Sequence, residues 1–249
     1  MSYHLRPSRC TALTGGGDSI RPPAKKLKMK FRDFQKIIAD IYGQPDDRHF
    51  SIYDLVSNQN RFTMRALKGI RKKDSRKIKA NLIIAFCWLL AIANRLHIDL
   101  DDAIWRRFPN LCSYCGKAPC QCKKIKPRKR RKIGRIGTAR PTTIAEFQAM
   151  FGRIYPPGSR SVVDAGIHLA EETGEIGEAI TIYLGEHRRS QFTEIENELA
   201  DWISTMFGLV NSINFDLERD VERSFKNGCH ICKSTPCKCS FSYIAKFDS

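Results

Sequence analysis

The chain has 249 residues and a formal net charge of +17, which is long enough for one large domain or two small ones with cores of their own. No apolar run approaches the length of a membrane span, and the N-terminal MSYHLRPSRC lacks the apolar stretch of a signal peptide. Eight of the ten cysteines form two tight clusters, a spacing that suits metal binding in a reducing compartment better than a secreted disulfide scaffold. We therefore expect a cytoplasmic protein that does not bind membranes.

Apolar residues at helical spacing, with Pro and Gly mainly between the apolar stretches, predict an all-α fold. In the first half we expect helices near 31–42, 51–69, 75–97 and 99–107. In the second half we expect them near 143–154, 162–184, 191–213 and 216–226. Four helices with short connections predict an antiparallel bundle in each half.

The charge is distributed unevenly along the chain. Residues 117–140 contain eleven Lys or Arg and no acidic residue, whereas residues 141–249 contain ten Lys or Arg and sixteen acidic residues. No Glu occurs before Glu146. A basic half and a basic linker therefore precede an acidic half, which indicates different roles for the two halves.

The cysteine clusters show that the chain contains a duplication. Both have the spacing C-x2-C-x4-C-x-C with Pro before the third cysteine, and they lie 117 residues apart. At the same offset Phe108 matches Phe225 and Asn94 matches Asn211, and Phe34-Gln35 matches Phe147-Gln148 at an offset of 113. We expect a basic N-terminal arm (1–30), a first copy (31–122), a basic linker that we interpret as mobile (123–141), a second copy (142–240) and a C-terminal tail (241–249).

Each cluster places four thiolates in a short loop, which suits a tetrahedral structural Zn²⁺. The sequence leaves open an iron–sulfur cluster, disulfides, or zinc shared between the clusters. Cys10 and Cys87 fall outside the pattern, and Cys87 is interpreted as a core residue. The predicted ligands of two structural zinc ions are Cys112, Cys115, Cys120, Cys122, Cys229, Cys232, Cys237 and Cys239.

The second copy contains a set of closely spaced carboxylates, Glu171-Glu172-x-x-Glu175 and Glu198-x-x-Asp201. A spacing of three residues places two side chains on one helical face, so two antiparallel helices could bring the pairs together around a divalent cation. Carboxylate oxygens favour Mg²⁺ or Mn²⁺ over zinc.

The alternative for these carboxylates is a solvated acidic face. No Lys or Arg occurs from Ser161 to His187 or from Ser190 to Glu218, although exposed acidic helices usually interleave basic residues. Glu172 also falls on the apolar face of its helix, where an unpaired carboxylate costs several kcal/mol. A bound cation is the simplest explanation for both observations.

The segments EETGE and ELAD resemble the EExxE…ExxD signature of the MazG-like, all-α nucleoside triphosphate pyrophosphatases. The resemblance covers residues 142–228 and extends through NSINFDLERDVERSF. It implies Mg²⁺-dependent hydrolysis between the α and β phosphates, with Glu172, Glu175, Glu198 and Asp201 as metal ligands. It further implies that Glu171 is another acid near the metal or orients the attacking water.

The first copy lacks these carboxylates, because Ser57, Asn58, Arg61, Asn81 and Ile84 occupy the equivalent positions. It is therefore a degenerate copy that cannot bind Mg²⁺ there. Family enzymes generally work as dimers, so the resemblance implies an intramolecular pseudo-dimer of two MazG-like four-helix units, each ending in a short zinc-binding loop of four cysteines.

In this arrangement Arg61 and Arg65 of the first copy are candidates for contacts with substrate phosphates, although a solvated scaffold surface explains them equally well. Arg188 and Arg189, in a loop after Gly185, are weaker candidates, for which a solvated loop is the alternative. Asn211 is also a weak candidate, because its survival in both copies favours a structural role.

Two functions follow. The first is a nucleotide pyrophosphohydrolase that converts a (d)NTP into a (d)NMP and pyrophosphate, for cleansing or depleting a nucleotide pool. The second is a non-catalytic, zinc-containing protein on the same MazG-like scaffold, with a nucleic-acid-binding or regulatory role. The linker PRKRRKIGRIGTAR could neutralise several phosphates, but it has no aromatic residue to stack on bases. A second copy of the chain, forming a homo-oligomer, is a further candidate partner.

Overall fold

The computed structural model describes residues 28–131, 133 and 139–247. Over these residues the protein is helical and contains no β-strand. Most of the predicted N-terminal arm, including Cys10, lies outside the described residues, as do linker residues 132 and 134–138. The helices are α1 (Phe31–His49), α2 (Ile52–Arg71), α3 (Ser75–Arg95), α4 (Leu100–Arg107), α5 (Cys122–Ile125), α6 (Ile144–Ile154), α7 (Val162–Glu186), α8 (Arg189–Ser212), α9 (Leu217–Phe225) and α10 (Phe241–Lys246).

The predicted all-α class is confirmed, and all eight expected helices are present. The largest difference in an expected helix is in α1, which continues through Pro45 to His49 instead of ending near residue 42. The extra turns are held by tertiary packing, because Phe50 at the end of α1 is buried with its ring edge-on to Trp88, at 5.4 Å between centroids. Two short helices were not expected: α5, which begins at the last cysteine of the first cluster, and α10, which lies in the segment predicted to be a tail.

Side-chain caps explain where many of the helices begin. Ser51 and Thr143 form capping boxes with acidic residues three positions later, at the starts of α2 and α6. Asp99 and Asp216 cap α4 and α9 at matching positions of the two copies. The local sequence therefore marks these boundaries, and distant side chains add to them, since the Ala145 N–H donates to Glu218 Oε2 and the Leu217 N–H donates to Gln148 Oε1.

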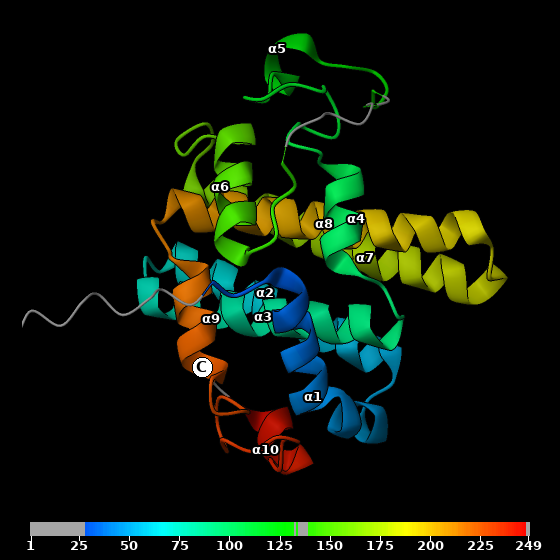
Figure 1. Cartoon of the computed structure of the whole chain (residues 1–249), viewed down its shortest axis with the longest axis vertical. Helices are drawn as coiled ribbons and strands as arrows, with labels where there is room; N and C mark the ends of the chain where they lie inside the picture. The colour runs from blue at the N-terminus through cyan, green and yellow to red at the C-terminus, as the bar shows by residue number, and fades with distance from the viewer. Residues whose placement is uncertain (1–27, 132, 134–138, 248–249) are drawn as a thin grey trace, which may run out of the picture.

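Four long helices form the centre of the molecule. The α2–α3 hairpin packs against the α7–α8 hairpin mainly through α2 and α7 (Figure 1). Gly166 permits this approach, because a Cβ atom at its position would lie 2.6 Å from the Ile70 Cδ1 atom. Helices α1 and α6 cover α3 and α8 respectively, and α4 of the first copy packs on α8 of the second. The two copies thus share one continuous core.

Matching hydrogen bonds recur in the two copies. Gln35 Nε2 donates to Asn94 Oδ1 at 3.1 Å and to the Ile98 carbonyl at 2.7 Å. In the second copy Gln148 Nε2 donates to Asn211 Oδ1 at 3.1 Å and to the Phe215 carbonyl at 2.8 Å. Each Asn amide donates back to the carbonyl of its glutamine. These contacts support the duplication and give Asn94 and Asn211 a structural role.

Each four-cysteine loop is attached to the opposite copy. The Cys120 N–H donates to the carbonyl of Ile154 at the end of α6, and the Cys237 N–H donates to the carbonyl of Ile41 in α1, both at 2.7 Å. The short helices α5 and α10, which follow the two loops, lie at opposite ends of the molecule (Figure 1). Each loop therefore ends its own copy and also binds the first helix of the other copy.

Helix α3 is long and apolar enough to span a membrane by length and composition alone. However, 61% of its most apolar window is buried inside the protein, where it contacts α1 and α2. Its apolar character is therefore explained by its position in the core.

Candidate active site and metal centres

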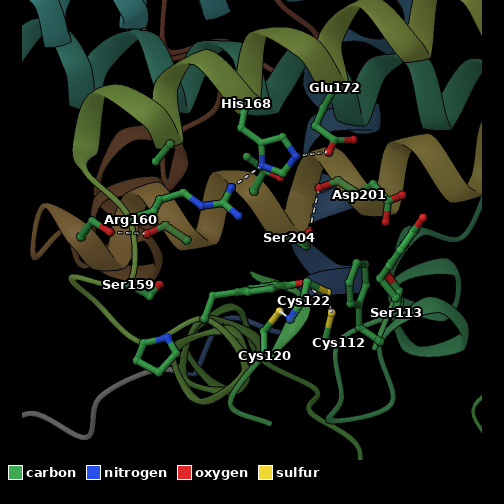
Figure 2. A pocket seen from close by; sticks show the side chains of 18 of the residues that line it. Cys112, Ser113, Cys120, Cys122, Ser159, Arg160, His168, Glu172, Asp201 and Ser204 are labelled. Carbon is green, nitrogen blue, oxygen red and sulfur yellow. Dashed lines mark hydrogen bonds and ion pairs between the residues drawn. The ribbon is translucent and has the colours of Figure 1, made fainter. Parts of the chain in front are cut away.

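The second copy contains a pocket of about 370 Å³ between α7, α8 and the first four-cysteine loop (residues 112–122). Figure 2 shows carboxylates from the two helices on one side and the cysteine loop of the first copy on the other. Both copies thus contribute to one pocket.

Three of the predicted carboxylates converge beside this pocket. Glu172, Glu175 and Glu198 each offer an oxygen within 4.8 Å of the others. Glu172 is buried, and among the described residues neither its Oε2 nor Glu198 Oε2 has a hydrogen-bond partner. Burial, together with the neighbouring carboxylates, raises the pKa of Glu198 to about 8. Converging carboxylates, two of which have a buried oxygen without a partner among the described residues, fit a hard divalent cation.

Asp201, the fourth predicted ligand, lines the pocket but is held by arginines. Arg107, in α4 of the first copy, donates to both carboxylate oxygens at 3.1 and 2.6 Å, and the linker residue Arg130 donates to Oδ2 at 3.0 Å. The side chains of Asp201 and Arg107 are only 8% and 13% exposed. The sequence shows no basic partner near these carboxylates, but for Asp201 the tertiary structure supplies two from distant segments.

Glu172 is oriented by a pair of basic side chains. His168 lies one helical turn earlier in α7, with Nε2 3.0 Å from Glu172 Oε1, and Arg160 contacts His168 Nδ1 (Figure 2). Because arginine can only donate, His168 Nδ1 accepts that bond and Nε2 carries the proton that is donated to Glu172. This chain holds one oxygen of Glu172 and leaves Oε2 unpaired.

The sulfur atoms in each four-cysteine loop are spaced for a tetrahedral metal. In the first loop Cys112 and Cys122 are separated by 3.7 Å between Sγ atoms, and Cys115 and Cys120 by 3.9 Å. A tetrahedron with Zn–S bonds of about 2.3 Å has edges of about 3.8 Å. Backbone N–H groups donate to several of the sulfurs, including Gln121 N–H to Cys115.

The second four-cysteine loop (residues 229–239) has the same geometry, with Sγ distances of 3.5 to 3.9 Å. Each cluster is complete in itself, with all four sulfurs within 4.8 Å of one another, so each can bind one zinc ion without sharing. Cys87, outside both clusters, is buried as expected.

The remaining predicted site residues lie elsewhere. Glu171 is exposed and does not line the pocket. Arg61 and Arg65 both donate to the Phe247 carbonyl at 2.6 Å, and the structure does not bring them to the carboxylates. The other two predicted arginines lie at the turn between α7 and α8. Arg188 pairs with Glu186, and Arg189 lies over the ring of Phe192.

The first copy has an equivalent pocket that is much smaller. Its volume is about 70 Å³, and Ile84, the counterpart of Asp201, lines it together with Phe247 and Ile244 of the C-terminal segment. An apolar wall thus replaces the acidic one, which agrees with the predicted loss of the metal site.

Arg107, Arg130, Arg160 and His168 are site residues that sequence reasoning missed. The position of His168 four residues before Glu172 was a usable signal, because residues at that spacing share a helical face. Arg107 and Arg130 gave no local signal, because they lie 94 and 71 residues from Asp201. Comparisons with family models, curated proteins and solved structures give no match to this chain.

Proposed function

We propose that the chain is a Mg²⁺-dependent nucleoside triphosphate pyrophosphohydrolase, which cleaves a (d)NTP into a (d)NMP and pyrophosphate to cleanse or deplete a nucleotide pool. The convergence of Glu172, Glu175 and Glu198, with two buried oxygens that lack partners among the described residues, is the observation that carries the proposal. Asp201, on the same helix face as Glu198, is the fourth ligand, because a carboxylate oxygen has two acceptor lone pairs and can bind the cation while Arg107 still donates to it.

Mg²⁺ held by such carboxylates neutralises phosphate charge and lowers the pKa of bound water. The side chains of the protein then bind and orient. His168 keeps Glu172 in one rotamer, while Arg130 and Arg160 line the pocket and can contact phosphate oxygens. The pocket has the size of a small-ligand site.

The two copies play different parts in this proposal and together form the MazG-like pseudo-dimer. The second copy supplies the acidic ligands, and the first supplies Arg107 and one wall of the pocket. We further propose that each four-cysteine loop holds one structural zinc, because the sulfur spacing suits a tetrahedron. The zinc-dependent loops would then keep both copies in the geometry that completes the site.

The test is a panel of NTPs and dNTPs incubated with Mg²⁺, with separate detection of monophosphate and pyrophosphate. Glu172→Gln should abolish turnover, because it removes a charged ligand with little change in shape. Glu178→Gln is the matched control, since Glu178 is exposed on the same helix and should leave turnover unchanged. Absence of turnover with every nucleotide, or equal turnover in Glu172→Gln, would refute the proposal.

A further inference from the structure

The chain folds back in the same way after each four-cysteine loop. Arg130 and Phe247 both lie eight residues beyond the last cysteine of their loops, at the 117-residue offset of the repeat. Arg130 lines the pocket of the second copy, and Phe247 lines the equivalent pocket of the first. The segment that follows each loop is therefore a wall of the pocket in the opposite copy.

The residues facing these two positions differ in a matched way. Arg130 donates to Asp201, whereas Phe247 shares its pocket with Ile84, the counterpart of Asp201. An ion pair in one pocket thus corresponds to an apolar pair in the other. The pocket with the apolar pair has a volume of about 70 Å³, and the pocket with the ion pair has a volume of about 370 Å³.

Arg130 is not needed to neutralise Asp201. Arg107 already donates to both oxygens of that carboxylate from a nearly buried position, and one negative charge is balanced by one guanidinium. Arg130 is the more accessible of the two, with its side chain 41% exposed. The pocket therefore contains one guanidinium beyond what Asp201 requires.

Neighbouring residues hold Arg130 at the edge of the pocket. Its Cζ atom lies 5.4 Å from the centre of the Tyr114 ring, and its NH1 donates to Ser113 Oγ at 3.2 Å. Both partners belong to the first four-cysteine loop, so the guanidinium is oriented before any ligand arrives.

We propose that Arg130 binds the phosphate chain of a nucleotide in this pocket, and that Asp201 takes the place of the phosphate in the free protein. When a metal-bound phosphate chain enters, Arg130 exchanges the carboxylate for a phosphate oxygen, which frees an acceptor position on Asp201 Oδ2 for the cation while Arg107 stays bonded. Cation and phosphate chain consequently bind together better than either binds alone. This inference rests on the proposed function, because it takes a nucleotide phosphate chain as the ligand.

The experiment is calorimetric titration of the full-length, zinc-containing protein with two probes: pyrophosphate in the presence of Mg²⁺, and Mg²⁺ alone. Arg130→Gln should weaken pyrophosphate binding by about tenfold or more, because a charge-assisted hydrogen bond is lost. The same variant should bind Mg²⁺ alone more tightly than the wild type, because Asp201 loses a competing cation. Arg128→Gln, an exposed charge change two residues earlier, is the control and should alter neither affinity.

The two expected affinity changes in Arg130→Gln have opposite signs, weaker for pyrophosphate and tighter for Mg²⁺, whereas a merely structural role would weaken both. Unchanged pyrophosphate affinity in Arg130→Gln, weaker binding of both probes, or an equal loss in Arg128→Gln would overturn the inference. If the wild type hydrolyses no nucleotide but shows the predicted titrations, the proposed function fails and the phosphate site stands. If hydrolysis occurs but Arg130→Gln binds pyrophosphate normally, only the phosphate site fails.

Discussion

The Arg107–Asp201 pair joins the two copies beside the candidate metal site, and its removal should destabilise the protein strongly. In Arg107→Ser, Asp201 would remain almost buried, with only the more exposed Arg130 as a partner. Removing one partner of a buried ion pair costs about 3–5 kcal/mol, and partial compensation by Arg130 places this variant near the lower end, at about 3 kcal/mol.

The repeat itself suggests the compensating change. Ser224 and Ile84 occupy the positions of Arg107 and Asp201 in the other copy, at the 117-residue offset. The double variant Arg107→Ser, Asp201→Ile removes both charges, so we expect it to recover most of the loss. The coupling energy of the double-mutant cycle should be about 2–3 kcal/mol.

Urea unfolding followed by helical circular dichroism measures these free energies, in buffer without Mg²⁺ and without a chelator, so that cysteine-bound metal is retained. Arg106→Ser is the surface control. The Arg106 side chain is 49% exposed, so its ion pair with Glu196 should contribute at most about 1 kcal/mol to stability. The reasoning would be refuted if Arg107→Ser lowered the free energy of unfolding by less than about 0.5 kcal/mol. It would also be refuted if the double variant lost the sum of the losses in the two single variants.

Three further predictions concern the metal loops, the helix interface and a buried acid. Cys115→Ser should lower the zinc content, measured by atomic emission, from two ions per chain to one; a content still at two would contradict independent sites. Gly166→Ala should destabilise by about 1–3 kcal/mol in thermal unfolding because its Cβ would crowd Ile70, whereas Gly177→Ala, whose nearest contact would be 3.6 Å, should be neutral or stabilising. Burial raises the pKa of Asp46 to about 7, so its native form binds a proton more tightly than the unfolded chain and stability falls as pH rises from about 4 through 7. Asp46→Asn should therefore be more stable than wild type at pH 8, by up to about 4 kcal/mol, with the difference vanishing near pH 4; a difference that does not depend on pH would contradict this cause.

The sequence alone determined the eight main helices, the duplication, and the cysteine and carboxylate candidates for metal ligands. Helix positions follow from apolar periodicity and from local caps such as Ser51 and Thr143, which act within one turn. The cysteine sets lie within eleven residues of chain, so their spacing already implies proximity. The convergence of Glu172 with Glu198 needed only that α7 and α8 form an antiparallel hairpin, which a short connection favours.

The tertiary structure decided how the copies combine. The packing partner of an apolar helix face depends on the shapes of helices that are distant in sequence. No local pattern therefore showed that α4 of the first copy would pack on α8 and bring Arg107 to Asp201. The same holds for the segments after the four-cysteine loops, one of which brings Arg130 into the open pocket while the other fills its counterpart with Phe247. Local periodicity and spacing therefore identified the carboxylates of the candidate site, whereas Arg107 and Arg130 come from segments that meet them only when both copies fold into one core.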